Sequence, residues 1–123
     1  WDSLTFSAGG MASTAGDLLV WLDAFFHNKV LKASTLAEMK SFVNARSNGR
    51  DNNIFDYGLG IANYDLNGIK LEGHPGGGFG GECFPFYYPA KDVSIVVTYN
   101  WSKKDNPAGK EILKRILAQL ILN

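Results

Sequence analysis

A tight-turn signal between two alternating segments constrains the fold of this chain more than any other feature. The segments Tyr57–Tyr64 and Ile69–His74 both have a period of two, which is typical of strands with one buried face. Between them lies Asn67-Gly68, and both residues tolerate the positive φ that a two-residue hairpin turn requires. The sequence therefore predicts an antiparallel hairpin.

Two more strands are predicted after this hairpin. Cys83–Tyr88 and Val93–Tyr99 are rich in aromatic and β-branched residues, and the turn residues Pro89–Asp92 separate them. A glycine-rich stretch, Gly73–Gly81, precedes the first of these strands. The middle of the chain thus predicts three or four antiparallel strands.

Two helices are predicted ahead of the strands. Thr14 with Asp17 three residues later is a variant of the capping box that starts a helix, and Asn28 is a typical stop. Between them, apolar residues recur at helical spacing and would form one face: Leu18, Leu22, Phe25 and Phe26. A shorter helix is predicted from Ser34, followed by an exposed polar loop over residues 44–53.

The plainest helical pattern is at the C-terminal end. Asn106 can cap a helix, and Pro107 suits its first position. The apolar residues behind them form a wide stripe: Ile112, Leu113, Ile116, Leu117, Leu120 and Ile121. The element order predicts an α+β fold, an antiparallel sheet with N-terminal helices and the Pro107–Leu122 helix packed on it.

Composition limits the class of protein. A chain of 123 residues with 46% hydrophobic residues fits one globular domain over residues 1–123. Twelve basic residues balance twelve acidic ones, which argues against a nucleic-acid partner or an anionic membrane surface. One cysteine excludes a disulfide framework, and no apolar run is long enough for a membrane segment.

The sequence contains only weak signals for a dinucleotide site and for a metal site. Gly76, Gly78 and Gly81 satisfy the string Gly-x-Gly-x-x-Gly, but a dinucleotide site needs a helix next, and the following residues predict a strand. The soft metal ligands His27, His74 and Cys83 do not fall at helical ligand spacing. We therefore expect neither a metal nor a cofactor, and we expect His27 to be a cation near a helix C-terminus or a surface residue.

His74 is the strongest candidate for a functional residue. Seven of the fourteen residues from Gly68 to Gly81 are glycine, which weakens a strand unless a backbone or ligand comes close. A histidine before such a stretch is a polar group beside a backbone surface open to close approach. The structural alternative is that His74 ends a strand and the glycines only bend the sheet.

Several segments resemble the serine beta-lactamase and penicillin-binding-protein-like hydrolases, above all the class C-like branch with its esterases and D-amino-acid-specific peptidases. The similar segments are Ser7–Leu18, Tyr57–Gly60, Gly73–Gly80, Val93–Asn100 and the C-terminal helix, in the family's order. Gly73–Gly80 resembles the third catalytic motif, in which His often replaces the Lys of Lys-Thr-Gly. The resemblance implies acyl-enzyme chemistry on a small-molecule or peptide substrate.

The family's nucleophile motif is not present in these residues. None of the eight serines is followed three residues later by Lys, and no Tyr or Ser is followed two residues later by Asn. In the family, both motifs precede the segment that resembles Ser7–Leu18. The resemblance therefore implies the C-terminal part of a larger serine hydrolase, inactive alone, whose parent would be periplasmic or secreted.

The resemblance also gives roles to residues of the third motif. His74 would stabilise charge and assist proton transfer, and the Gly77 backbone N–H would be one of two oxyanion donors. Gly76 and Gly78 would let the strand lie close to the substrate. Pro75 departs from the family's Thr, and because it lacks a hydroxyl and an N–H, it favours esters or peptides over carboxylate-bearing lactams.

Two other hypotheses about the function of the chain remain open. The chain could be a non-catalytic binding or scaffold module that kept the fold and lost the nucleophile, or a self-standing α+β domain whose resemblance is accidental. Strands of the N-terminal part complete the sheet in the family, so a sheet edge would lack its neighbour here. Because unpaired edges recruit other chains, we expect self-association.

Overall fold

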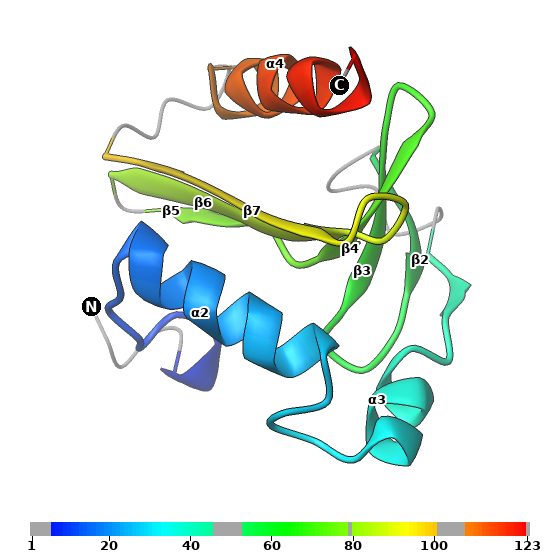
Figure 1. Ribbon diagram of the computed structural model, residues 1–123. Helices are drawn as coiled ribbons and strands as arrows, with labels where there is room; N and C mark the ends of the chain where they lie inside the picture. Colours follow the sequence, from blue (N-terminus) through cyan, green and yellow to red (C-terminus); the bar gives the residue numbers. More distant parts are fainter. Residues whose placement is uncertain (1–5, 46–52, 79, 101–107, 123) are drawn as a thin grey trace.

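The computed structural model describes residues 6–45, 53–78, 80–100 and 108–122. A short 3₁₀ turn, η1 (Phe6–Ala8), precedes the helices α2 (Ala15–Phe26), α3 (Ala33–Met39) and α4 (Ala108–Leu122). The strands are β1 (Val43–Asn44), β2 (Ile54–Tyr57), β3 (Ala62–Leu66), β4 (Ile69–Gly73), β5 (Gly76–Gly78), β6 (Gly81–Tyr88) and β7 (Val93–Tyr99). The predicted α+β class is confirmed: α2 and α4 cover opposite faces of one antiparallel sheet (Figure 1).

β6 is the strand around which the sheet is organised. The hydrogen-bonded order is β1-β2-β3-β4-β6-β5, and β7 pairs with β6 outside this path. β4 and β5 therefore share one edge of β6, while β7 occupies the other edge.

The predicted hairpin is confirmed in its position and its turn. Leu66 pairs with Ile69, which leaves a two-residue loop in which Asn67 has φ 57° and Gly68 has φ 87°. These two positive angles match the right-handed twist of the flanking strands. The bounds of β7, Val93–Tyr99, are those predicted from the sequence.

The prediction of one strand over Tyr57–Tyr64 is wrong, because the chain turns in its middle. The Gly58 N–H donates to the Ile61 carbonyl at 2.7 Å, and Gly60 has φ 76°. A Cβ on Gly58 would lie 2.1 Å from the Met39 carbonyl oxygen, so only glycine fits against the end of α3. This tertiary contact separates β2 from β3.

α2 begins and ends as the sequence predicts. The Thr14 hydroxyl accepts from the Asp17 backbone N–H at 3.1 Å and donates to the Asp17 carboxylate at 2.9 Å. This differs from a standard capping box, in which the carboxylate bonds the N-cap backbone. Asn28, at φ 59°, follows the last turn as a left-handed stop residue.

α4 packs on the sheet, but along a narrower face than predicted. Leu113 and Leu117 are fully buried against a core from the strands, which consists of Tyr64, Leu66, Leu71, Phe84, Phe86, Ile95 and Val97. Ile112 and Ile121 stand on the two flanks of the buried stripe and are 44% and 48% exposed. Asn106, Pro107 and residues 46–52 of the predicted loop lie outside the described residues.

Candidate functional site

The glycine-rich stretch forms a strand with a break, and not a loop. β4 ends at the pair Gly73–Phe86, and β5 begins at the pair Gly76–Cys83. The step between these pairs is three positions on either strand, so no residue is inserted. β4 and β5 therefore continue each other along β6.

The register fixes which way the Gly77 backbone points. Leu66 and Ile69 flank the two-residue turn Asn67-Gly68 and so form a hydrogen-bonded pair. By alternation, Gly73 is then hydrogen-bonded to Ala62 and not to Phe86. Antiparallel pairs alternate between hydrogen-bonded and non-hydrogen-bonded, so Gly77 and Glu82 form the second kind. The N–H and C=O of Gly77 thus point away from β6.

Two prolines explain the break between β4 and β5. Continuation of the register puts His74 opposite Pro85 at a position where the two residues would exchange hydrogen bonds. Pro85 has no N–H, so one of these bonds cannot form. Pro75 lacks the N–H that would otherwise point outward, toward a further strand. His74-Pro75 is therefore weakly paired with β6 on one side and cannot donate to a further strand on the other.

The outer edge of β5 is open because β3 begins only at Ala62, opposite the end of β4. The last β3–β4 pair is Ala62–Gly73, and the turn at residues 58–61 carries the chain away from the sheet. Among the described residues, no strand pairs with the outer edge of β5. Gly77 is exposed there with both backbone groups outward, an arrangement that can bind an extended ligand by strand addition.

The glycines of this segment differ in the space around them. A Cβ on Gly73 would lie 2.2 Å from the Pro85 carbonyl oxygen, and one on Gly77 would lie 2.7 Å from Cγ of Glu82. A Cβ on Gly76 would meet no atom within 4 Å. Gly73 is therefore required by the packing of β4 on β6, whereas Gly76 borders open space.

His74 stands in the break, exposed, with its ring held by two contacts. Its Nδ1 lies 2.8 Å from the Pro75 carbonyl oxygen. Its ring meets the Tyr57 ring edge-to-face, with centroids 5.5 Å apart and planes at 88°. Of the four residues singled out in the sequence, Gly76, Gly77 and Gly78 form β5, and His74 lies in the break directly before it.

Tyr57 is the neighbour that the sequence did not indicate as part of the site. It is half-buried at the end of β2, and the adjoining turn is tied to α3 by a 2.9 Å hydrogen bond from the Leu59 N–H to the Met39 carbonyl. No local pattern in the sequence shows that Tyr57 contacts a histidine seventeen residues later.

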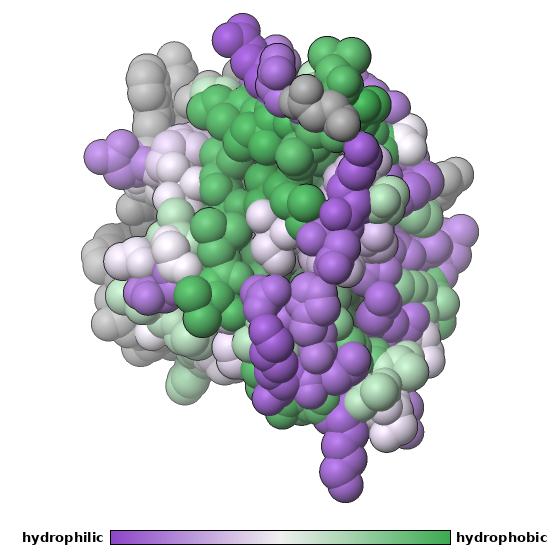
Figure 2. Space-filling view, in the orientation of Figure 1, coloured by the Kyte–Doolittle hydropathy of each residue, from purple (hydrophilic) through white to green (hydrophobic). Residues whose placement is uncertain are grey.

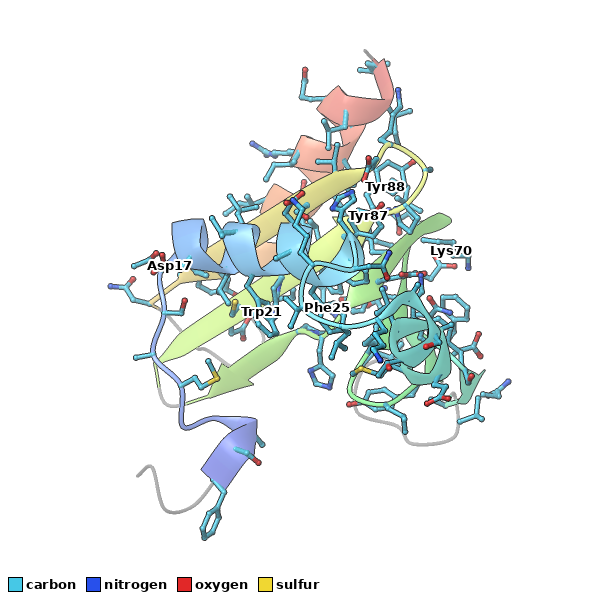
Figure 3. All side chains as sticks on the ribbon, turned by 60° about the horizontal axis from the view of Figure 1, so that its bottom comes forward. Asp17, Trp21, Phe25, Lys70, Tyr87 and Tyr88 are labelled. Atoms are coloured by element: carbon cyan, nitrogen blue, oxygen red, sulfur yellow. The ribbon has the colours of Figure 1, made fainter. Side chains whose placement is uncertain are left out.

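His27 belongs to a different cluster, as the sequence prediction of a helix-end cation implies. At the C-cap of α2 its Nδ1 lies 2.8 Å from the Asp23 carbonyl oxygen, and its Nε2 lies 2.8 Å from Asp92 Oδ1. The Asp23 carbonyl and the Asp92 carboxylate raise the pKa of His27. The Tyr87 hydroxyl, labelled in Figure 3, also donates to Asp92. Partial burial of Tyr87, together with this hydrogen bond to the Asp92 carboxylate, raises the pKa of Tyr87 to about 12.

The described part of the chain contains no cluster of metal ligands and no strand–helix turn of the dinucleotide-binding kind. No group of three His, Cys, Asp or Glu residues there could hold a metal ion. Cys83 is half-buried, and burial raises the pKa of its thiol. The Gly-x-Gly-x-x-Gly string leads into β6, a strand, and not into the helix a dinucleotide site needs. No helix among the described residues has the length and hydrophobicity to cross a membrane.

Comparison with known proteins decides the family. The Beta-lactamase family profile matches residues 1–119. The chain belongs to the beta-lactamase family. No curated protein sequence matches this beta-lactamase-family chain significantly.

Two solved structures show how much of a relative the chain represents. The D-amino acid amidase from Ochrobactrum anthropi SV3, complexed with D-phenylalanine, is 26% identical, with a TM-score of 0.79 over 91% of this chain and 37% of the amidase. A D-stereospecific amidohydrolase from Streptomyces sp. is 27% identical, with a TM-score of 0.60 over 72% of this chain and 25% of that one. The chain thus has a hydrolase fold of this family and spans about a third of the amidase.

Proposed function

We propose that this chain is the C-terminal part of a serine hydrolase that cleaves an amide or ester through an acyl-enzyme. The open β5 edge carries this proposal, because it exposes the Gly77 N–H three residues from His74 in the same extended segment. An oxyanion needs a fixed backbone donor of this kind. The names of the two solved relatives, an amidase and an amidohydrolase, support the same reaction class.

The proposed reaction uses an upstream serine as the nucleophile. Its hydroxyl oxygen bonds to the substrate carbonyl carbon, while its proton passes to the basic groups of the upstream motifs. The Gly77 N–H donates to the resulting oxyanion, and the serine's own backbone N–H is the second donor. The C–N or C–O bond then breaks, the leaving group takes a proton, and water hydrolyses the acyl-enzyme to release the acid.

His74 and the small residues around it hold and polarise the substrate in this proposal. His74 would contact the reacting groups, and Gly76 and Gly78 would let the substrate lie against the strand. Pro75 offers no hydroxyl for a substrate carboxylate. We therefore favour amide or ester substrates over carboxylate-bearing lactams.

Assays of the 123-residue chain and of a longer product of the same gene test the proposal. The 123-residue chain is expected to hydrolyse neither nitrophenyl acetate nor nitrocefin above background, because oxyanion donors without the nucleophile retain little catalysis. The longer chain should hydrolyse the ester and be labelled by a fluorophosphonate. A longer chain that folds but shows neither property would make the protein a non-catalytic binding module.

A second proposal concerns self-association of the 123-residue chain. In the described residues β7 pairs only with β6, and the alternation of the ladder points the Ser94, Val96 and Thr98 backbones outward. On the face in Figure 2, hydrophobic residues gather over α4 and the sheet directly below it. An unpaired strand of seven residues beside such a surface favours pairing with a second copy.

Light scattering over a range of concentrations tests the association. We expect a dimer or larger species for the 123-residue chain. Val96→Pro should favour the monomer, because it removes an outward N–H and leaves the β6 ladder intact. A concentrated wild-type sample that stays monomeric would contradict this proposal.

A further inference from the structure

Gly77 at the open edge belongs to a row of three residues that crosses the sheet. It pairs with Glu82 of β6, and Glu82 pairs in turn with Tyr99 of β7. Residues directly opposite each other in antiparallel strands have their side chains on the same face. Phe84, the next residue of β6 on that face, is buried in the core beneath α4. The side chains of Glu82 and Tyr99 therefore lie on the α4 side of the sheet.

The Glu82 side chain covers Gly77 on this side. A Cβ on Gly77 would lie 2.7 Å from Cγ of Glu82 and 3.5 Å from both its Cβ and its Cδ. The stem of Glu82 thus occupies the space that a side chain at position 77 would need. β5 consists of the glycines Gly76–Gly78, and glycine has the greatest backbone freedom of all residues. Glu82 therefore supplies a side-chain contact that β5 itself lacks.

Tyr99 holds the end of the Glu82 side chain. Its hydroxyl donates to Oε2 of Glu82 and accepts from the Gly109 backbone N–H in the first turn of α4. The Tyr99 ring stacks on Phe84, with centroids 6.4 Å apart and planes at 12°. A Cβ on Gly109 would lie 2.5 Å from Cε1 of Tyr99, so the start of α4 closes over this ring (Figure 1). Burial and the hydrogen bond to Glu82 raise the pKa of Tyr99, which keeps its hydroxyl a donor.

We propose that Glu82 is a positioning residue, anchored by Tyr99, which fixes the direction of the Gly77 backbone at the open edge. The inference rests on the proposed function, in which the Gly77 N–H is an oxyanion donor. Such a donor must lie about 2.7–3.1 Å from the oxyanion, and a displacement of about 1 Å lowers the rate by up to roughly 10²-fold. A glycine strand at an edge is too weakly held for this limit unless a neighbour restrains it.

Amide hydrogen exchange of the 123-residue chain, resolved by NMR, tests this support without any assay of activity. By the alternation of the ladder, Gly76 exchanges both backbone hydrogen bonds with its β6 partner, so its amide should exchange more slowly than the outward amide of Gly77. Glu82→Ala should speed the exchange of Gly76 by about ten- to twentyfold, the loss of one buried methylene and one hydrogen bond. Ile95, in the β6–β7 ladder, should keep its rate. An unchanged rate at Gly76 would overturn the inference.

Two tyrosine variants test the anchor. Tyr99→Phe keeps the ring and removes the hydroxyl, so it should speed the exchange of Gly76 by about fivefold, the effect of one hydrogen bond. Tyr88→Phe is the matched control, because Tyr88 ends the same strand as Glu82 and its hydroxyl has no hydrogen bond to a described residue. This control should leave Gly76 unchanged. A wild-type rate at Gly76 in Tyr99→Phe would remove Tyr99 as the anchor.

Kinetics of the longer chain connect this support to the proposed reaction. Glu82→Ala should lower kcat/KM by about 10- to 10²-fold, chiefly through kcat, because the oxyanion forms only in the transition state. Glu82→Gln keeps the stem and an acceptor for Tyr99, so it should stay within about threefold of the wild type.

The pattern of losses separates the alternatives. Equal losses in Glu82→Gln and Glu82→Ala would assign the effect to the carboxyl group and overturn positioning by the stem. A loss confined to KM would overturn it as well. A longer wild-type chain that hydrolyses no substrate would contradict the proposed function, and the exchange rate of Gly76 would still decide whether Glu82 holds β5.

Discussion

Replacement of His74 by alanine, in a longer chain with the upstream serine, is expected to lower kcat/KM by about 10²–10³-fold. A side chain that hydrogen-bonds the reacting groups of the substrate contributes an effect of this size. Stability should change little, because the His74 side chain is exposed and, among the described residues, has one hydrogen bond, to Pro75, and one ring contact, with Tyr57. Steady-state kinetics together with thermal unfolding measure both effects.

His27→Ala is the matched control for this substitution. His27 is the other histidine of the chain, and its ring bonds to Asp23 and Asp92, away from the β5 edge. His27→Ala should keep the kcat/KM of the wild type. A loss in this variant as well would show a general effect of removing an imidazole. An unchanged rate in His74→Ala would return His74 to a structural role at the end of β4.

The sequence predicted the elements whose signals are local. Asn67 and Gly68 predicted their turn because both tolerate positive φ, and the bounds of β7 followed from its β-branched run. The turn inside Tyr57–Tyr64 was missed, because its cause is the contact of Gly58 with the end of α3. Spacing in the sequence cannot show a contact between distant segments.

The candidate site was predictable in its residues but not in its geometry. The resemblance to a family motif singled out His74 and Gly77 from their order in the chain. That the Gly77 N–H faces an open edge depends on the pairing with β6 and on the start of β3 at Ala62, which leaves β5 without a neighbour on its outer side in the described residues. The contact with Tyr57 depends on three strands lying side by side, which no single segment contains.

The glycines of the site give a second prediction, in which neighbouring substitutions have opposite effects. Gly73→Ala should destabilise the 123-residue chain by about 1–3 kcal/mol, because the new Cβ would lie 2.2 Å from a backbone oxygen of Pro85. The strands must move apart where β4 leaves the core beside the buried Phe86. Urea unfolding measures the loss as a lower transition midpoint.

Gly76→Ala is the matched control in the same strand pair, since its Cβ meets nothing within 4 Å. Its stability should stay within about 0.5 kcal/mol of the wild type. In the longer chain the same methyl group would occupy space where the substrate approaches the strand, and a displacement of about 1 Å lowers turnover by up to about 10²-fold. Gly76→Ala should therefore fold normally and lose activity. Full activity of Gly76→Ala would show that the substrate does not approach Gly76. Wild-type stability of Gly73→Ala would show that β4 and β6 are less closely packed than this geometry requires.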